Sequence, residues 1–491
     1  MGGVLRDLFL NRAKENPDFD FCLKKGAINF GRKLAKQIKA GFVVLDKEHG
    51  ACRLVKRINN RPYTFDFTDF RGRDIKEDLL RRDFTINAMA LELDKLFSKN
   101  AALSLRQKPA LDSLSRPHKT AAFKPRMEAD RDSAKKETPG GAPLIDPHGG
   151  RRDLNAKTIR IVDIRAFDDD PLRILRTFSF ASLLDFKIDP ATLRLARQKR
   201  NKLGGVSYER IRDELFKILD NPRAFDYLVQ LDKLKILKVI FPELEKMRGV
   251  GQGPYHHLDV WQHSLETVRQ LELLAVELKD NREIRIFLDE TISGERKRLA
   301  LLKLGAILHD IGKPAALRRE GKKLKFHGHE RIGCDMSQEI LRRLKLSNDE
   351  TSALAKIVLW HLRPGYLADN AELTPRAIFR FFRDAGGETI SILLLSLADQ
   401  RATKGPLTTK ESRRRHEKVV FGLLKEYFRR KKEKKIPRLL NGDDLMQRFK
   451  LEPSPLIGKI LSELEEAQAI GKIKHKKDAW QLAKKIVGGS S

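Results

Sequence analysis

The sequence predicts an α+β protein in which a small mixed sheet comes first and helices make up most of the remainder. Two short apolar runs, residues 41–45 and 63–67, are bounded by turns and are typical of strands. From Asp169 onward apolar residues recur at helical spacing instead, as at Leu172, Leu175 and Phe178. The 491 residues suffice for three or four domains of ~100–200 residues each.

The composition changes divide the chain into four expected parts. Residues 1–168 form a head, 169–250 a helical neck, 251–405 a second helical block and 406–491 a basic helical tail. Residues 95–143 interrupt the head, because they mix Lys, Ser, Pro, Arg and Ala without periodicity. We expect them to form a disordered basic insertion in a surface loop.

Charge is the strongest signal in the composition. Lys and Arg number 99 against 67 Asp and Glu, a net charge of +32, which suits a polyanionic partner. Composition alone does not separate RNA from DNA or from an anionic membrane. No run approaches the ~20 apolar residues of a membrane span. The opening residues lack a signal peptide and three scattered cysteines fit a reduced cytosol, so we expect a cytoplasmic protein.

Three carboxylates fall on predicted strands of the head. Asp18 and Asp20 alternate with Phe19, so that both side chains point to one face of a strand. Asp66 lies between Phe65 and Phe67, and its face differs from the aromatic one. Carboxylates in this arrangement hold hard divalent cations, which in turn hold nucleotide phosphates. The pattern predicts two-metal nucleotidyl transfer by in-line attack on the α-phosphate of a nucleoside triphosphate.

Two further segments favour a nucleotide site. Gly2-Gly3, followed by Arg6-Asp7, would open a helix whose free N–H groups can hold a phosphate. In Asp169-Asp170-Pro171-Leu172-Arg173, the proline fixes the two carboxylates at a helix start. Asp170 can accept from the amino group that cytosine and adenine share, while Arg173 donates to the adjacent ring nitrogen. The alternative is an acidic helix start with a local ion pair.

A second constellation lies in the helical block. Its members occur in the order His, His-Asp, His, His, Asp, and they are His263, His309, Asp310, His329, His361 and Asp399. Adjacent His and Asp can ligate one metal ion, and His329 and His361 can hold a second ion. Imidazole with carboxylate suits Mn²⁺, Ni²⁺, Fe²⁺ or Zn²⁺ better than Mg²⁺ alone. A water bound to such a metal would attack a phosphate ester.

Together with Arg81-Arg82-Asp83-Phe84-Thr85-Ile86-Asn87-Ala88, these motifs resemble the bacterial class II tRNA nucleotidyltransferases and their poly(A) polymerase relatives. The resemblance implies a head like that of DNA polymerase β, with Asp18 and Asp20 as Mg²⁺ ligands and Asp66 as third catalytic carboxylate. It also implies a set of nucleotide-binding residues: Gly2, Gly3, Arg6, Asp7, Arg82, Asp83, Asn87, Asp170, Arg173, Arg176 and Arg210. For Asp83, a buried structural partner of a neighbouring arginine is the alternative.

Two other segments match the same family. The residues Asp146-Pro147-His148-Gly149-Gly150 resemble a turn that hinges head to neck, with Asp146 a weaker catalytic candidate. Residues 207–214 resemble the neck. The segment 309–313, His-Asp-Ile-Gly-Lys, resembles the HD phosphohydrolase signature. In relatives an apolar strand precedes the Gly-Gly turn, whereas here Met1 directly precedes Gly2.

The resemblance implies an enzyme that adds all or part of the 3′-terminal CCA to tRNA from CTP and ATP, with no membrane partner. One alternative is a poly(A) polymerase. The other is an HD phosphohydrolase whose inactive head serves as an RNA-binding module. The histidine block and the segment 441–446 favour the first interpretation. Nucleotide choice, oligomeric state and the identity of the HD metal stay open at this point.

Overall fold

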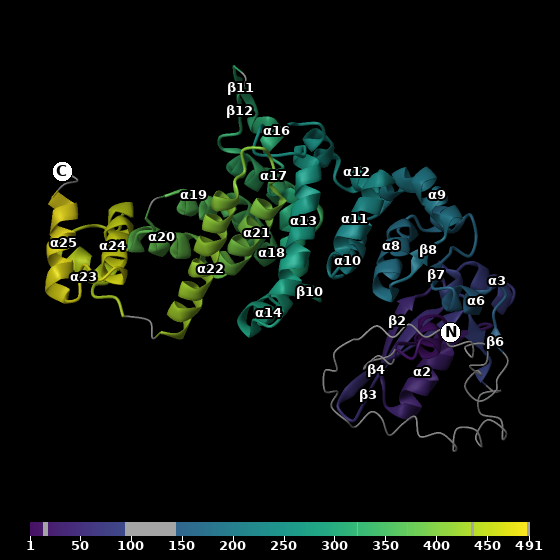
Figure 1. Cartoon of the computed structure of the whole chain (residues 1–491). Helices are drawn as coiled ribbons and strands as arrows, with labels where there is room; N and C mark the ends of the chain where they lie inside the picture. Colours follow the sequence, from purple (N-terminus) through teal and green to yellow (C-terminus); the bar gives the residue numbers. More distant parts are fainter. Residues whose placement is uncertain (13–17, 94–143, 322, 371, 434–436, 489–491) are drawn as a thin grey trace. The chain divides into compact units, whose positions relative to one another are not determined.

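The structure is a computed structural model that describes residues 1–12, 18–93, 144–321, 323–370, 372–433 and 437–488 (Figure 1). The expected insertion at 95–143 lies outside the described residues. The chain divides into two compact units, Met1–Val206 and Ser207–Ser491. The four-part division expected above stays a prediction.

A four-stranded mixed sheet forms the centre of the first unit. Its strand order is β1-β4-β3-β2. Strand β1 (Asp18–Leu23) is parallel to β4 (Arg61–Asp69), whereas β3 (Ala51–Ile58) is antiparallel to both β4 and β2 (Gly41–Asp46). Helix α2 (Ala27–Ile38) packs on the sheet around Cys52, Leu54 and Phe67. The strands predicted at 41–45 and 63–67 are confirmed. Sheet and helix together form a small α/β layer that presents its other face for chemistry.

Short elements complete the head. They include the 3-10 turn η1 (Thr85–Asn87) and the two-residue strand β5 (Ala90–Leu91). The remaining elements are α1 (Gly3–Phe9), α3 (Ile75–Leu80), β6 (Leu144–Ile145), α6 (Gly150–Asn155), β7 (Thr158–Ile159) and β8 (Lys187–Ile188). Strand β6 pairs with β5, and β8 pairs with β7.

Gly150 lies where α6 meets η1, and the approach is too close for a side chain. A Cβ at this position would lie 2.2 Å from the Thr85 carbonyl oxygen and 2.9 Å from Met89 Cγ. We therefore expect Gly150→Ala to lower the free energy of unfolding by ~1–3 kcal/mol, measured by urea denaturation. Gly204→Ala is the control, because a Cβ there meets nothing within 4 Å. Equal stability of both variants would contradict this packing.

Helices α7 (Ala166–Asp169), α8 (Arg173–Leu184) and α9 (Pro190–Lys199), with the 3-10 segment η5 (Arg200–Gly205), end the first unit. The expected helix start holds for Asp170, whose carboxylate accepts the Leu172 N–H at 3.2 Å and whose carbonyl accepts the Arg173 N–H at 3.0 Å, but it is wrong for Asp169. Asp169 is the last residue of α7, Asp170 is extended, and α8 begins only at Arg173. The reason is that Pro171 lacks an N–H and disfavours helical backbone at Asp170.

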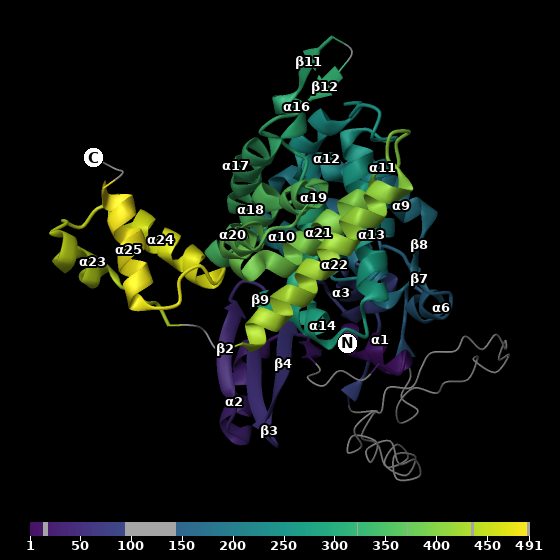
Figure 2. The ribbon, with the colours of Figure 1, turned by 60° about the vertical axis from the view of Figure 1, so that its left-hand side comes forward.

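The second unit is almost entirely helical (Figures 1 and 2). It begins with α10 (Tyr208–Leu219), α11 (Ala224–Lys233), α12 (Ile236–Ile240) and η6 (Pro242–Met247). Its central helix is α21 (Thr389–Ala402), in which residues 389–398 are all buried. The helices α13 (Val260–Glu277), α15 (Arg298–Leu308), α18 (Asn348–Trp360) and α22 (Lys410–Lys432) pack against α21. The α+β fold class is confirmed.

Smaller elements surround this core. They are α14 (Arg282–Asp289), α16 (Lys313–Ala316), α17 (His329–Arg343), α19 (Arg363–Asp369), α20 (Pro375–Ala385), η7 (Gly386–Glu388) and the hairpins β9–β10 (Thr291–Ser293, Arg296–Lys297) and β11–β12 (Arg318–Glu320, Lys323–Lys325). A C-terminal bundle of α23 (Gly442–Phe449), α24 (Pro455–Ala469) and α25 (Lys476–Gly488) has its own apolar core. None of the helices in the described ranges is long and apolar enough to cross a membrane.

Candidate functional sites

The three strand carboxylates of the head lie on one face of the sheet. In the register of β1 and β4, Asp20 is paired with Asp66 and Asp18 with Thr64. Side chains of paired residues on neighbouring strands point the same way. The opposite face carries the aromatic residues, with Phe19 stacked on Phe65 at 5.5 Å and Phe21 on Phe67 at 5.0 Å between ring centroids.

The electrostatics of this face favour a bound cation. Burial raises the pKa of the Asp20 carboxyl, and the neighbouring carboxylates of Asp66 and Asp18 raise it further, although Arg82 opposes them. Asp66 receives both Nε and Nη2 of Arg53 at 2.8 Å. The Arg53 guanidinium therefore neutralises only one member of the cluster.

Arg82 is anchored beside this face by a residue that the sequence reasoning missed. Asp78, 1% exposed, accepts Nη2 and Nε of Arg82 at 3.2 and 3.4 Å and the backbone N–H of Arg71 at 3.0 Å. Burial acts to lower the pKa of Arg82, but Asp78, Cys22 and Asp20 together outweigh it and the pKa is raised. The sequence did indicate this contact, because Asp78 precedes Arg82 by four residues. Asp78 lies on the short helix α3, and Arg82 follows its end.

The other predicted nucleotide residues of motif Arg82–Asn87 and of α1 form a buried network. Arg6 donates Nη1 to Asn87 Oδ1 at 2.9 Å and Nε to Asp7 Oδ1 at 2.8 Å. Asn87 in turn donates to Asp83 Oδ1 at 3.1 Å, and Arg176 Nη2 lies 2.7 Å from Asp83 Oδ2. In this structure Asp83 is thus the buried partner of an arginine, as the alternative interpretation has it.

The Gly2-Gly3 turn lies against the carboxylate face. Gly2 has φ +65, and a Cβ there would lie 3.4 Å from Asp20 Oδ2. Helix α1 follows directly. Because glycine adopts positive φ without penalty, the backbone can approach Asp20 closely at this point.

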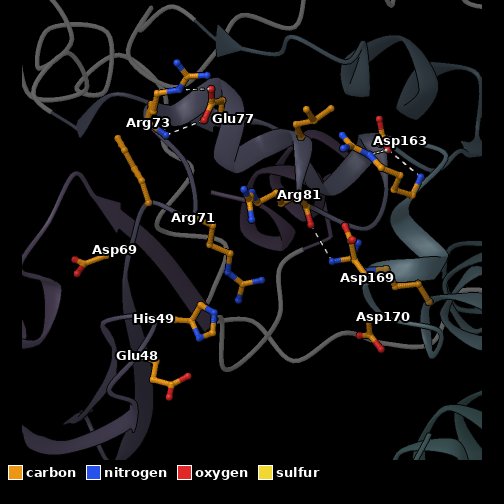
Figure 3. A pocket seen from close by; sticks show the side chains of 14 residues that line it. Glu48, His49, Asp69, Arg71, Arg73, Glu77, Arg81, Asp163, Asp169 and Asp170 are labelled. Atoms are coloured by element: carbon orange, nitrogen blue, oxygen red, sulfur yellow. Dashed lines mark hydrogen bonds and ion pairs between the residues drawn. The ribbon is translucent and has the colours of Figure 1, made fainter. Parts of the chain in front are cut away.

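A cleft of about 1080 Å³ in the first unit contains the pair predicted to read the base (Figure 3). His49 and Arg71 line one side, and Asp169 and Asp170 line another. Arg173 also lines it and donates Nη2 to the Arg81 carbonyl at 2.8 Å and Nη1 to that of Ala166 at 3.3 Å. These contacts use two of its five N–H groups and fix the guanidinium plane.

Two remaining candidates lie elsewhere. Asp146 accepts the N–H groups of Gly150 and Arg151 at 2.6 and 2.9 Å, so it caps the start of α6 and stabilises the turn. Arg210 is an exposed residue of α10 in the second unit.

The six predicted metal-binding residues of the second unit converge from separate helices. Asp310 lies in their midst and is 1% exposed. Its Oδ2 lies 3.2 Å from His309 Nε2 and 3.8 Å from His263 Nε2, and its Oδ1 lies 3.2 Å from His329 Nε2 and 3.7 Å from His361 Nε2. Asp399 Oδ1 lies 2.8 Å from His263 Nε2.

Three of the imidazoles are oriented by helix ends. The Nδ1 atoms of His309, His329 and His361 bond to the carbonyls of Ala306, Phe326 and Val358 at 2.9, 2.7 and 2.6 Å. Their Nε2 atoms and Asp310 Oδ1 are buried and make no hydrogen bond within the described residues, while Asp310 Oδ2 lies 2.6 Å from the ammonium of Lys313. Buried polar atoms without hydrogen bonds are costly, and a divalent cation would satisfy them. The donor set fits a metal centre.

Charge in this centre is strongly coupled. Although burial acts to raise it, the imidazole of His309 and the ammonium of Lys313 hold the pKa of Asp310 well below its usual range. Burial lowers the pKa of His361 to about 3, so this ring is a neutral donor at physiological pH. Lys313 Nζ lies 2.6 Å from Asp310 Oδ2, a contact that the sequence reasoning did not assign although the spacing of three residues indicated it.

Comparison with known proteins matches three family profiles. The profile "Poly A polymerase head domain" covers residues 1–100, "Probable RNA and SrmB- binding site of polymerase A" covers 185–247 and "HD domain" covers 260–404. The nucleotidyltransferase and HD families generally use divalent metals.

Full-length relatives agree with the profiles. The A-adding tRNA nucleotidyltransferase of Deinococcus radiodurans is 28% identical and covers 96% of this chain and 92% of its own length. The CC-adding tRNA nucleotidyltransferase of Geobacter sulfurreducens is also 28% identical, over 99% of this chain and 91% of its own length. The structure of the Thermotoga maritima CCA-adding enzyme complexed with tRNA shares the fold at TM-score 0.58 and 21% identity, covering 100% and 90% of the two chains.

The fold and the two sites define a nucleotidyltransferase that carries an HD domain. The chain is similar to tRNA nucleotidyltransferases over nearly its whole length, and its head matches that of poly(A) polymerases.

Proposed function

We propose that this protein is a template-independent tRNA nucleotidyltransferase that adds or repairs the 3′-terminal CCA, or part of it, from CTP and ATP. The observation that carries the proposal is the face shared by Asp18, Asp20 and Asp66, with Arg82 fixed beside it. Relatives named as A-adding and CC-adding enzymes, aligned over more than 90% of their length, support the tRNA substrate, as does a multifunctional CCA protein aligned over 67% of its length.

In this proposal Asp18 and Asp20 hold Mg²⁺, which supplies charge neutralisation for the triphosphate and activation of the attacking 3′ hydroxyl. Asp66 is the third carboxylate, and its paired position beside Asp20 on the same face supports this role. Arg82, fixed by Asp78, neutralises triphosphate charge. Gly3 would bring its backbone N–H to the phosphates, whereas the Gly2 N–H donates to the Met89 carbonyl at 3.1 Å and fixes the turn. Arg6, Asp7, Asn87, Asp83 and Arg176 hold the wall of this site rigid.

Asp170 and Arg173 select the base in the cleft of Figure 3. A carboxylate next to a guanidinium offers one acceptor and one donor, which fits the edges of cytosine and adenine. Guanine and uracil present the reverse polarity. The fixed guanidinium of Arg173 supports this role, because a selecting group has to be held in place before the nucleotide arrives.

Replacing either residue by alanine is therefore expected to relax nucleotide choice. Asp170→Ala or Arg173→Ala should narrow the preference for CTP and ATP over UTP and GTP by about 10–100-fold, since a bidentate contact contributes ~1–3 kcal/mol of discrimination. The measurement is kcat/KM for each of the four triphosphates with a tRNA substrate. A folded variant with an unchanged preference for CTP and ATP would mean that Asp170 and Arg173 serve only to end one helix and begin the next.

The HD centre is proposed as a second active site, a metal-dependent phosphohydrolase. Each Asp310 oxygen faces its own pair of imidazoles, so Asp310 would help to hold each of two ions. His263, His309 and Asp399 would complete one site, and His329 and His361 the other. Mn²⁺, Ni²⁺ or another divalent ion would supply an activated water for attack on a phosphomonoester or a 2′,3′-cyclic phosphate.

One assay separates the three functions. Purified protein is incubated with labelled CTP or ATP and tRNA lacking the terminal A, CA or CCA. Addition that stops after the missing nucleotides supports the proposal, whereas continued addition of A indicates a poly(A) polymerase. No addition, with phosphate release intact, indicates an HD phosphohydrolase with an inactive head.

A further inference from the structure

Helix α22 (Lys410–Lys432) has one face that packs into the core of the second unit. Val420, Leu423, Leu424 and Phe428 are buried, and the helix packs on α21 and α19. His416 adds a polar contact from Nε2 to Ser396 Oγ at 3.2 Å. These contacts fix the rotation of the helix about its axis, and they thereby determine which side chains face solvent.

The solvent face carries a row of cations that we term the basic stripe. At 100° per residue all its members fall within about 100° of arc, and the helix is about 34 Å long. Each of them is exposed, and they are Lys410, Arg414, Lys418, Lys425, Arg429 and Lys432.

The cations of the stripe differ in their partners. Arg429 is paired with Glu426 and Glu433, and Lys432 lies 2.9 Å from Glu283. The other four have no ion pair or side-chain hydrogen bond within the part of the chain that the structure describes. These four are Lys410, Arg414, Lys418 and Lys425.

Helix stability does not account for the stripe. Cations spaced four residues apart, as at 410, 414 and 418, repel one another and destabilise an isolated helix. The carboxylate of Glu417 lies on the flank and binds Arg401. Exposed Glu411 is the one carboxylate in the same arc, so the face carries six cations and one anion, whereas a solvated helix face would intersperse both signs more evenly.

We propose that the basic stripe of α22 binds the phosphate backbone of a duplex arm of tRNA. The four unpartnered cations extend over about 22 Å along a straight, rigid helix. Lys and Arg side chains that contact phosphates, and not the edges of bases, supply affinity and positioning but do not select a sequence. This suits an enzyme that accepts many tRNAs. That the RNA is tRNA rests on the proposed function.

The test compares two charge-matched quadruple variants of the full-length protein. In the stripe variant, Lys410, Arg414, Lys418 and Lys425 are replaced by Gln. In the control, four exposed lysines from separate places, Lys33, Lys47, Lys187 and Lys279, are replaced by Gln. Binding of tRNA lacking CCA is measured by anisotropy between about 50 and 300 mM KCl, and far-UV circular dichroism and melting temperature verify folding.

The stripe variant is expected to bind tRNA roughly tenfold or more weakly at about 0.1 M salt, with the slope of log Kd against log[KCl] reduced by about 3. The KM for tRNA rises accordingly, while kcat and the KM for ATP and CTP stay at wild-type values. The control variant loses the same charge but should change the slope by less than about 1.

Equal salt slopes for the stripe variant, the control and the wild type would overturn the proposal. Equal losses of tRNA affinity in both variants would also overturn it, because the change in net charge would then be the cause. Binding of the wild type to anionic phospholipid vesicles, lost in the stripe variant while tRNA binding persists, would also overturn it and assign the stripe to a membrane. If the wild type adds no nucleotide, the proposed function fails, but the slopes still test the stripe against RNA.

Discussion

Asp18→Ala and Asp20→Ala are each expected to reduce nucleotide addition by about 10³-fold or more, because a lost metal ligand removes several kcal/mol of transition-state stabilisation. Binding of tRNA should stay within about twofold of wild type, since phosphate contacts, not the carboxylates, supply affinity. The measurement is single-turnover incorporation with Mg²⁺, alongside tRNA binding by anisotropy.

Conservative variants separate chemistry from folding. Asp20→Asn keeps the size of the side chain and should be nearly as inactive as Asp20→Ala, because the amide lacks the negative charge. Thr64→Val lies opposite Asp18 on the same face and should leave addition within a few-fold of wild type. Wild-type addition by both aspartate variants would place the catalytic site elsewhere.

Asp310→Ala is expected to abolish metal-dependent hydrolysis and to remove both ions, because each carboxylate oxygen faces a different pair of imidazoles. His361→Ala should lose only one ion, and His309→Ala or Asp399→Ala should lose the other. Metal content is measured by elemental analysis, and hydrolysis by phosphate release from a 2′-nucleotide or a 2′,3′-cyclic phosphate with Mn²⁺, Ni²⁺ or Mg²⁺.

Nucleotide addition provides the internal control, since all these variants should retain it. His327→Ala, an exposed histidine outside the centre, should keep both metal and hydrolysis. If the wild type binds no transition metal and releases no phosphate with any of the three ions, the HD centre has a structural role only.

The parts of the fold that follow strict periodicity were predictable from the sequence. Alternation of Asp18, Phe19 and Asp20 was sufficient to predict a strand with one acidic and one aromatic face, and the pairing with β4 has that form. The order of His and Asp in the second unit likewise predicted a cluster, because those residue types combine in metal sites.

Other features depend on long-range packing, which periodicity does not encode. Nothing local indicates that Asp83 pairs with Arg176, 93 positions away in the chain, or that Arg6 reaches Asn87. The turn at 85–87 could not be predicted, because a 3-10 turn has no repeat long enough to detect. The break between α7 and α8 was missed although Pro171 marked it, since a proline is equally common inside the first helical turn.

The stacking of Phe19 on Phe65 and of Phe21 on Phe67 has a consequence for how this head tolerates change. Because side chains alternate between the two faces, deleting or inserting one residue in β1 would turn the carboxylates into the apolar layer and expose the rings. Such an insertion or deletion would therefore unfold the head as well as inactivate it. Length variation that survives selection should therefore be confined to the connections outside the paired segments. The stacked aromatic pairs thus link the correct length of the strand to the stability of the head.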